Sequence, residues 1–235
     1  MNKISFIRAG CQDVWNAFMV KGVDFRGRDI PYCPTTATIL PKNLISYPEA
    51  KTIYNKHKHE KDFFIDAFVH FYIDDCKFDS PSSGIWADWK TALKILRHFA
   101  GIITPDFSTC LDFPEPLKLW NTYRMRAFGY WYGRQGGAVI NNVRWGTGET
   151  FDYCFEGITT NSVVAIGTVA SNLRNPANRN NFVIGFKRML KILNPHTIIV
   201  YGSDKCKCFE EVRKKIKIIR FRSNKDLALR GDINV

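Results

Sequence analysis

Short apolar runs alternate with amphipathic stretches along the chain from about residue 63 to its end. The runs cover residues 66–74, 101–107, 138–145, 162–168, 197–202 and 217–221. Several are apolar at consecutive positions, as in Val-Val-Ala-Ile within residues 162–168. Strands buried on both faces of a parallel sheet have this continuous pattern, whereas half-exposed strands alternate. The pattern predicts an α/β fold with a mostly parallel sheet of about six βα units.

The stretches between the runs repeat apolar residues at the three- and four-residue spacing of helices. They predict helices over residues 86–99, from Pro116 to the glycines at 136 and 137, over residues 179–193, and over residues 209–216. A closed barrel of eight βα units needs roughly 250 residues, and only about 170 follow residue 62. We therefore expect a partial TIM-like barrel or an open, curved sheet.

Residues 1–62 lack this alternation of apolar runs and amphipathic stretches, and they contain four prolines, at positions 31, 34, 41 and 48. Short helices are predicted over residues 13–20 and 47–58, and an edge strand over residues 35–40. This predicts two regions: a less regular N-terminal extension, residues 1–62, packed on an α/β core, residues 63–235, which ends in a basic segment.

The chain carries a formal charge of +12, from 34 Lys and Arg against 22 Asp and Glu. Half of the surplus falls in residues 205–235, which hold 10 basic and 4 acidic residues. A basic surface concentrates polyanions, so nucleic acid or a nucleotide is a candidate partner, with Lys214, Lys215 and Lys217 as candidate contacts. The alternative is a solvated face that serves only solubility.

Several classes of protein do not fit this sequence. No apolar run approaches the roughly 18 residues of a membrane span, and the first residues lack the apolar core of a secretory signal. The seven cysteines are scattered, and only Cys206 and Cys208 are close, without the second pair that a zinc site needs. The sequence predicts a soluble, cytoplasmic protein with reduced thiols and no membrane partner.

Acidic side chains follow two of the predicted strands. Asp74 and Asp75 end the first run, and Asp106 lies at the end of the second. Ligands of parallel α/β folds bind beyond the carboxyl ends of the strands, where such acids converge. They would serve as acid and base, or Asp74 and Asp106 would hold a divalent cation such as Mg²⁺ against a phosphate. The alternative is that they cap helices and order turns.

Basic and aromatic residues complete this predicted rim. Arg144 follows the third strand, and Arg124 lies on the helix that begins at Pro116; guanidinium groups suit phosphate. Trp145 and Tyr201 end strands and are candidates for stacking on a base, and Gly202 allows close backbone approach to a ligand. The alternatives are internal salt bridges from the arginines to the aspartates, and core packing of the rings.

Five segments together resemble the domain of unknown function 4417 family, found in bacteria, phages and other mobile elements. They are Val69–Phe78, Thr104–Ser108, Leu119–Arg126, Asn142–Trp145 and Leu193–Gly202, with Pro-Asp-Phe-Ser and Trp-Asn-Thr-Tyr-Arg as the most specific motifs. The resemblance covers roughly residues 25–210 and implies a mobile-element protein in the cytoplasm of a bacterial host, without implying a reaction. It marks Asp74, Asp75, Asp106, Ser108, Asn121, Arg124, Arg144, Trp145 and Gly202.

Two functional hypotheses follow. In the first, the protein binds nucleic acid, a nucleotide or a host protein through its basic surface and a pocket at the strand ends. In the second, it is a metal-dependent enzyme that acts on a nucleotide or nucleic-acid phosphate with Asp74, Asp75 and Asp106. The sequence leaves the substrate, the metal and the oligomeric state open.

Overall fold

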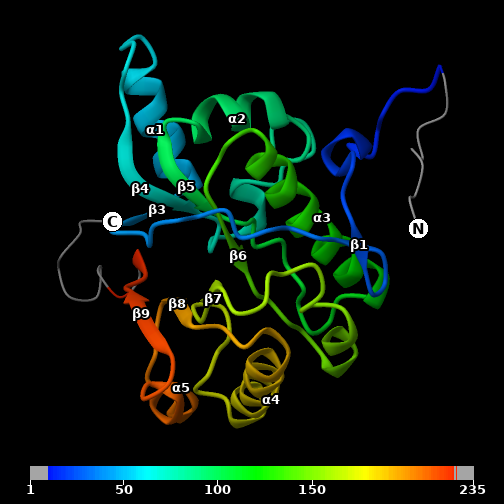
Figure 1. Ribbon diagram of the computed structural model, residues 1–235, viewed down its shortest axis with the longest axis vertical. Helices are drawn as coiled ribbons and strands as arrows, with labels where there is room; N and C mark the ends of the chain where they lie inside the picture. The colour runs from blue at the N-terminus through cyan, green and yellow to red at the C-terminus, as the bar shows by residue number, and fades with distance from the viewer. Residues whose placement is uncertain (1–9, 225, 227–235) are drawn as a thin grey trace.

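The fold is built on one parallel sheet, described in a computed structural model for residues 10–224 and 226. Seven strands follow one another in chain order across the sheet, each parallel to its neighbours. The strands are β3 (Leu44–Ser46), β4 (Ile65–His70), β5 (Phe99–Ile103), β6 (Val139–Asn142), β7 (Val163–Gly167), β8 (Thr197–Tyr201) and β9 (Lys217–Phe221). The sheet curls into a partial barrel, which confirms the predicted fold class (Figure 1).

The longer connections between strands are helical. The helices are α1 (Tyr47–His57), α2 (Trp89–Leu96), α3 (Glu115–Arg134), α4 (Pro176–Leu193) and α5 (Lys207–Val212). Because crossovers between adjacent parallel strands are right-handed, consecutive units place their helices on the same face of the sheet. Figure 1 shows α1 and α2 beside β3–β5 in its upper part, and α4 and α5 beside β8 and β9 in its lower part. The β6–β7 connection has instead a 3₁₀ helix, η3 (Gly148–Asp152).

Apolar side chains gather in three clusters. One lies between α1, α2, α3 and the first strands, and the second lies between α4, α5 and the last strands. The third lies on the inner face of the sheet and includes Phe68, Ile103, Ile140, Ala165 and Ile199 from successive strands.

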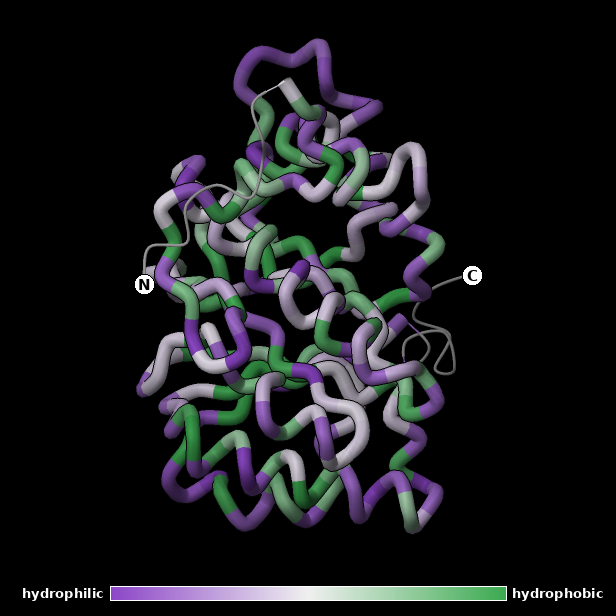
Figure 2. Tube along the Cα trace, turned by 90° about the vertical axis from the view of Figure 1, so that its right-hand side faces the viewer, coloured by the Kyte–Doolittle hydropathy of each residue, from purple (hydrophilic) through white to green (hydrophobic). Residues whose placement is uncertain are grey.

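Figure 2 shows a hydrophilic loop at the top of the molecule, which Figure 1 places between α1 and β4.

Local sequence explains where several helices begin and end. Ser46 caps α1: its hydroxyl accepts from the Glu49 backbone N–H, and the Glu49 carboxylate accepts from the Ser46 N–H at 2.7 Å. This capping box satisfies amides that have no partner within the helix. At α4, the Asn175 side chain accepts from two backbone amides, and Asn194 ends the helix in the left-handed conformation. The prediction of a helix at residues 47–58 is thus confirmed.

The N-terminal region differs from the prediction. Residues 35–40 form no strand; Thr36 and Ala37 instead donate backbone hydrogen bonds to the Val139 carbonyl at the start of β6. The edge strand is β3, which pairs Leu44 with Phe68 and makes β3 and α1 a further βα unit of the same sheet.

The rest of this region is less regular. The predicted helix at residues 13–20 is a 3₁₀ helix, η1 (Ala17–Val20). A small antiparallel pair, β1 (Phe25–Arg26) with β2 (Ile30–Pro31), was not predicted.

Strand and helix limits also shift in the core. Strand β4 ends at His70, four residues before Asp74, and β5 begins at Phe99, which the sequence assigned to the preceding helix. Among the helices of the described residues, none is long and apolar enough to cross a membrane.

Candidate functional site

An ion pair joins the ends of β5 and β6. The carboxylate Oδ2 of Asp106 lies 2.5 Å from the Arg144 guanidinium, and the Asn142 side chain donates to Asp106 Oδ1 at 2.7 Å. The Tyr72 hydroxyl in turn donates to the Asn142 side chain at 3.0 Å. Residues from β6 and from the loops after β4 and β5 therefore share one polar network, and both carboxylate oxygens of Asp106 are engaged.

Burial shapes the protonation of this pair. It raises the pKa of Asp106, an effect that the Arg144 charge and the Asn142 hydrogen bond only partly offset. Burial lowers the pKa of Arg144, but Asp106, Cys110 and Asp75 together outweigh burial, and the pKa of Arg144 is raised. The Asp75 charge acts on both groups in the same direction, so Asp75 lies close to this pair.

Three rings cover the adjoining inner surface of the sheet. The Tyr201 ring lies 4.2 Å from the His70 ring and is stacked on Tyr72 at 5.3 Å, between centroids. Nδ1 of His70 accepts from the Tyr72 backbone N–H, and burial lowers the pKa of His70 to about 3. The imidazole is therefore neutral at physiological pH, and the Tyr201 ring already packs against protein rings.

A second network fastens the loop after β5 to α3 and to the loop after β4. Asp75 accepts from the Ser108 backbone N–H at 3.0 Å and from its hydroxyl at 2.9 Å. The Asn121 side chain donates to the Ser108 carbonyl, and Arg124 donates to Asn121 at 2.6 Å. Arg124 also forms a two-point ion pair with Asp79, at 2.8 and 3.0 Å.

The Arg124 guanidinium sits in an aromatic setting. Its carbon lies 3.9 Å from the Phe107 ring centroid, and Trp86 and Trp120 lie within 6 Å. Burial lowers the pKa of Arg124 and raises that of Asp79, while their mutual attraction opposes both shifts. Arg124 Nε is buried without a hydrogen-bond partner among the described residues.

The structure thus brings together four of the eight residues predicted for the rim and two residues that the family resemblance marked. Asp75, Asp106, Ser108, Asn121, Arg124 and Arg144 lie in the two networks. The internal salt bridge considered for the arginines is present for Arg144 with Asp106, whereas Arg124 pairs with a different acid, Asp79. Sequence reasoning did not assign Tyr72 and Asn142 to the site, although their positions within and just beyond strands could have identified inward-facing polar groups.

Asp74 does not join these networks. Its side chain is 81% exposed and pairs with Lys77 at 3.7 Å. Because β4 ends at His70, the chain has already turned, and Asp75 rather than Asp74 reaches the neighbouring loop. Over residues 10–224 and 226, no three His, Cys, Asp or Glu side chains group into a potential metal site, so the expected convergence of Asp74 with Asp106 on a cation is not assembled there.

The remaining predicted residues lie in separate surroundings. Trp145 packs on α4, 5.1 Å from the Phe182 ring, and a Cβ at Gly185 would lie 2.3 Å from its indole nitrogen. Gly202 has a φ of 111° and follows β8, where a Cβ would meet Thr168. Its carbonyl accepts from Arg220.

The basic residues predicted as contacts lie at the opposite end of the sheet. Lys217 begins β9 and pairs with Thr197, the first residue of β8, and Lys214 and Lys215 precede it. The strands are parallel, so these lysines lie at the amino edge, whereas Asp106 and Arg144 lie at the carboxyl edge. The basic turn and the strand-end networks are therefore two separate places on the molecule.

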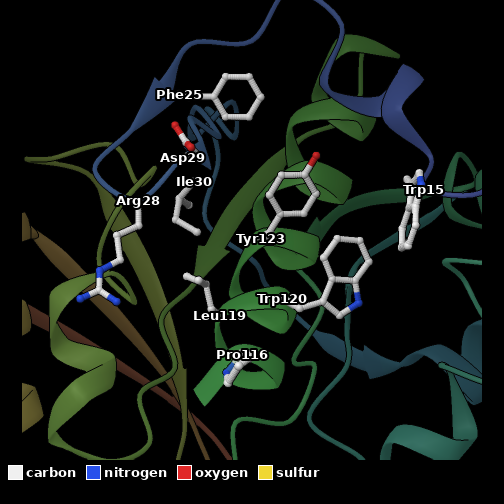
Figure 3. A pocket seen from close by; sticks show the side chains of 9 residues that line it. All are labelled: Trp15, Phe25, Arg28, Asp29, Ile30, Pro116, Leu119, Trp120 and Tyr123. Atoms are coloured by element: carbon white, nitrogen blue, oxygen red, sulfur yellow. The ribbon is translucent and has the colours of Figure 1, made fainter. Parts of the chain in front are cut away.

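A groove of about 550 Å³ lies elsewhere, between the β1–β2 pair and the outer side of α3 (Figure 3). Trp15, Trp120 and Tyr123 are among the residues that line it, and none of the predicted site residues does. Trp120 of α3 borders this groove, and Leu117 in the first turn of α3 is 38% exposed.

The comparisons with known proteins identify relatives in bacteriophages. The chain is 31% identical over 134 residues to the Gene 1 protein of Mycobacterium phage L5, covering 57% of this chain and 56% of that protein. It is 28% identical over 166 residues to the Gene 1 protein of Mycobacterium phage D29, covering 70% and 57%. The matched parts span a little over half the length of these curated relatives.

No solved structure matches the chain. The sequence profile of one family, the domain of unknown function DUF4417, matches residues 27–222 and so includes the sheet and both strand-end networks. This phage-related chain belongs to the DUF4417 family.

Proposed function

We propose that this protein binds nucleic acid through a basic outer face formed by α4 and the turn before β9. One observation carries the proposal: residues 157–203 contain no Asp or Glu, although this segment includes an 18-residue helix with exposed polar positions. A segment of this length with both charge signs would be the ordinary case for a solvated surface. The charge bias favours a polyanionic partner.

The excess of basic residues continues to residue 224, beyond the last strand, β9. Residues 157–224 hold 13 Lys and Arg against 3 Asp and Glu, a net charge of +10 within a chain total of +12. Of the three acids, Asp204 already pairs with Arg213 and Arg220. Among the described residues, Lys214, Lys215 and Lys217 form no ion pair, so their charges remain available to phosphates.

On α4 these charges lie at exposed positions, away from the buried ones. α4 buries Phe182, Phe186 and Met189 against the sheet and exposes Arg179, Lys187, Arg188 and Lys191. The Phe186 and Phe209 rings lie 5.1 Å apart and join α4 to α5, beside each other in Figure 1. An 18-residue helix is about 27 Å long, so this face spans most of one turn of duplex DNA.

Contacts of this kind reach phosphates and carry no base sequence. The proposal therefore describes sequence-independent binding, dominated by electrostatics and sensitive to salt. Single- and double-stranded forms both present phosphates, and comparing them shows which geometry the face prefers.

The enzyme hypothesis has less support. Both oxygens of Asp75 accept from Ser108, those of Asp106 from Asn142 and Arg144, and those of Asp79 from Arg124. Carboxylates held in this way order loops, and a cation would have to compete with arginine for Asp106 and Asp79 and with Ser108 for Asp75. We therefore propose that the strand-end networks hold the loops after β4 and β5 in place.

Charge-neutralising variants test the proposal. We expect Lys187→Gln/Arg188→Gln/Lys191→Gln and Lys214→Gln/Lys215→Gln/Lys217→Gln each to lower the affinity for a fluorescent 20-base-pair DNA by about tenfold or more at 50 mM salt. On α4, glutamine keeps the helix propensity of lysine and arginine, and Lys214, Lys215 and Lys217 are exposed positions outside helices, so folding is preserved in both variants.

The matched control is Lys51→Gln/Lys56→Gln/Lys58→Gln, which removes the same charge from exposed positions on and just after α1. Fluorescence anisotropy should show near wild-type affinity for this variant. Equal losses in all three variants would mean that only net charge matters. Absence of DNA or RNA binding by the wild-type protein would overturn the proposal and favour a protein partner.

A further inference from the structure

Two cysteines at the start of α5 are in direct contact. The Cys208 thiol donates to the Cys206 sulfur, and the two Sγ atoms are 3.1 Å apart. Cys208 is buried against Phe209 and α4, whereas Cys206 is partly exposed. Among the described residues, the other five cysteines make no sulfur–sulfur contact.

The geometry is close to that of a covalent bond. A disulfide joins its sulfurs at about 2.05 Å, so the two Sγ atoms need to approach each other by about 1 Å. Cys208 is the donor of this hydrogen bond and the Cys206 sulfur accepts it, so the proton lies on Cys208. Burial and this hydrogen bond raise the pKa of Cys208 well above its ordinary value. The exposed sulfur is thus the attacking one, with a second sulfur in place behind it.

We propose that Cys206 and Cys208 form a reversible dithiol–disulfide site that is oxidised by small acidic disulfides such as glutathione disulfide. The exposed side chains of Lys205 and Lys207, on either side of Cys206, favour the approach of such an anion. This site goes beyond the proposed nucleic-acid binding and does not depend on it.

The exchange proceeds in two steps. The Cys206 thiolate attacks one sulfur of the small disulfide, forms a mixed disulfide and releases one small thiolate, which takes up a proton. Cys208 then loses its proton, attacks the Cys206 sulfur and releases the second small thiolate. In total, two protein thiols become one disulfide, and one small disulfide is reduced to two thiols.

The ring closed by a Cys-X-Cys disulfide is small and therefore strained. Strained disulfides have more oxidising potentials and are reduced more easily than structural ones. The disulfide between Cys206 and Cys208 therefore forms and is reduced according to the ratio of small thiols to small disulfides. It is not a permanent cross-link of the fold.

Mass spectrometry of the full folded chain tests the site. Cleavage after glutamate gives a peptide of residues 157–210, in which Cys206 and Cys208 are the only cysteines. After incubation with mixtures of reduced and oxidised glutathione and alkylation of free thiols, we expect this peptide to appear unalkylated and lighter by about 2 Da, the mass of two hydrogens. Dithiothreitol should reverse the change.

Variants separate the two steps. Cys208→Ser should stop at a glutathione adduct on Cys206, and Cys206→Ser should leave the buried Cys208 reduced in the folded protein. Cys76→Ser, which removes an exposed cysteine, should leave the 2 Da loss unchanged. A stable glutathione adduct in the wild-type peptide would overturn the proposal. So would two free thiols under conditions that modify Cys76.

Discussion

The Asp106 carboxylate and the Arg144 guanidinium, 2.5 Å apart, join the loop after β5 to the end of β6 at the carboxyl edge of the sheet. Both side chains are mostly buried, at 10% and 21% exposure. A buried charge that loses its partner is strongly destabilising, whereas loss of both charges costs less. The pair therefore holds the loop after β5 against the segment that follows β6.

A double-mutant cycle measures this fastening. We expect Asp106→Asn and Arg144→Gln each to lower the free energy of unfolding by about 2 to 4 kcal/mol, and the double variant to cost less than their sum by about 1 to 3 kcal/mol. Urea unfolding followed by circular dichroism gives these values. The exposed pair Lys42–Asp66 is the control and should show no measurable coupling. Additive effects at Asp106 and Arg144 would contradict the assignment.

His70 gives the fold a defined sensitivity to acid. Its pKa is about 3 in the folded protein because of burial, below the value near 6.5 of an unfolded chain. The folded state therefore resists protonation, and its stability falls as the pH drops below about 6.5. Between pH 7.5 and pH 5.0 the loss is about 2 kcal/mol.

The variant His70→Asn keeps a hydrogen-bond acceptor for the Tyr72 amide and removes the titration. Urea unfolding at pH 7.5 and pH 5.0 should show a smaller loss of stability in the variant than in the wild type. Equal losses would mean that His70 is not protonated on unfolding in this range.

Arg126 ties α3 to the loops that follow β6. It is fully buried and donates to the carbonyls of Asn142, Cys154 and Glu156. Arg126→Met has a similar volume but leaves three acceptors unpaired, so we expect a loss of about 3 kcal/mol or more in unfolding free energy. Arg126→Lys should recover only part of it, because one ammonium cannot reproduce the planar set of donors. Stability equal to that of an Arg97→Met surface control would refute this role.

Gly185 lets α4 lie against Trp145. A Cβ there would be 2.3 Å from the indole nitrogen, whereas a Cβ at Gly148 meets nothing within 4 Å. Alanine favours a helix over glycine by about 1 kcal/mol, yet we expect Gly185→Ala to destabilise by about 1 to 3 kcal/mol because of the clash. Gly148→Ala is the control and should be near neutral in thermal unfolding. A stabilised Gly185→Ala would show that Trp145 is free to move, as a base-stacking residue must be.

The alternation of strands and helices in the core was predictable because strands buried on both faces have continuous apolar sequences. The strand β3 was missed because Leu44–Ser46 is too short to form a pattern of its own and is defined by pairing with β4. The β1–β2 pair was missed for the same reason, since it is held by contacts with distant parts of the chain.

The site was predictable where a polar residue lies close after the end of its strand. Arg144, for example, lies two residues after Asn142, the last residue of β6. It was not predictable at Asp74, because the sequence does not show that β4 ends at His70 and that the chain turns before the acids. Tyr201 ends β8 as expected, whereas Trp145 lies three residues beyond the end of β6 at Asn142. Sequence alone does not reveal that neighbouring rings cover both side chains.

The dependence of DNA affinity on salt tests the proposed function most directly. If about five phosphates contact the basic face of α4 and the turn before β9, a plot of log K against log salt concentration for the wild-type protein has a slope near −4 or steeper. Neutralising Lys214, Lys215 and Lys217 then makes that slope shallower by about 2 to 3. A flat plot, or a slope that this variant leaves unchanged, would contradict the account.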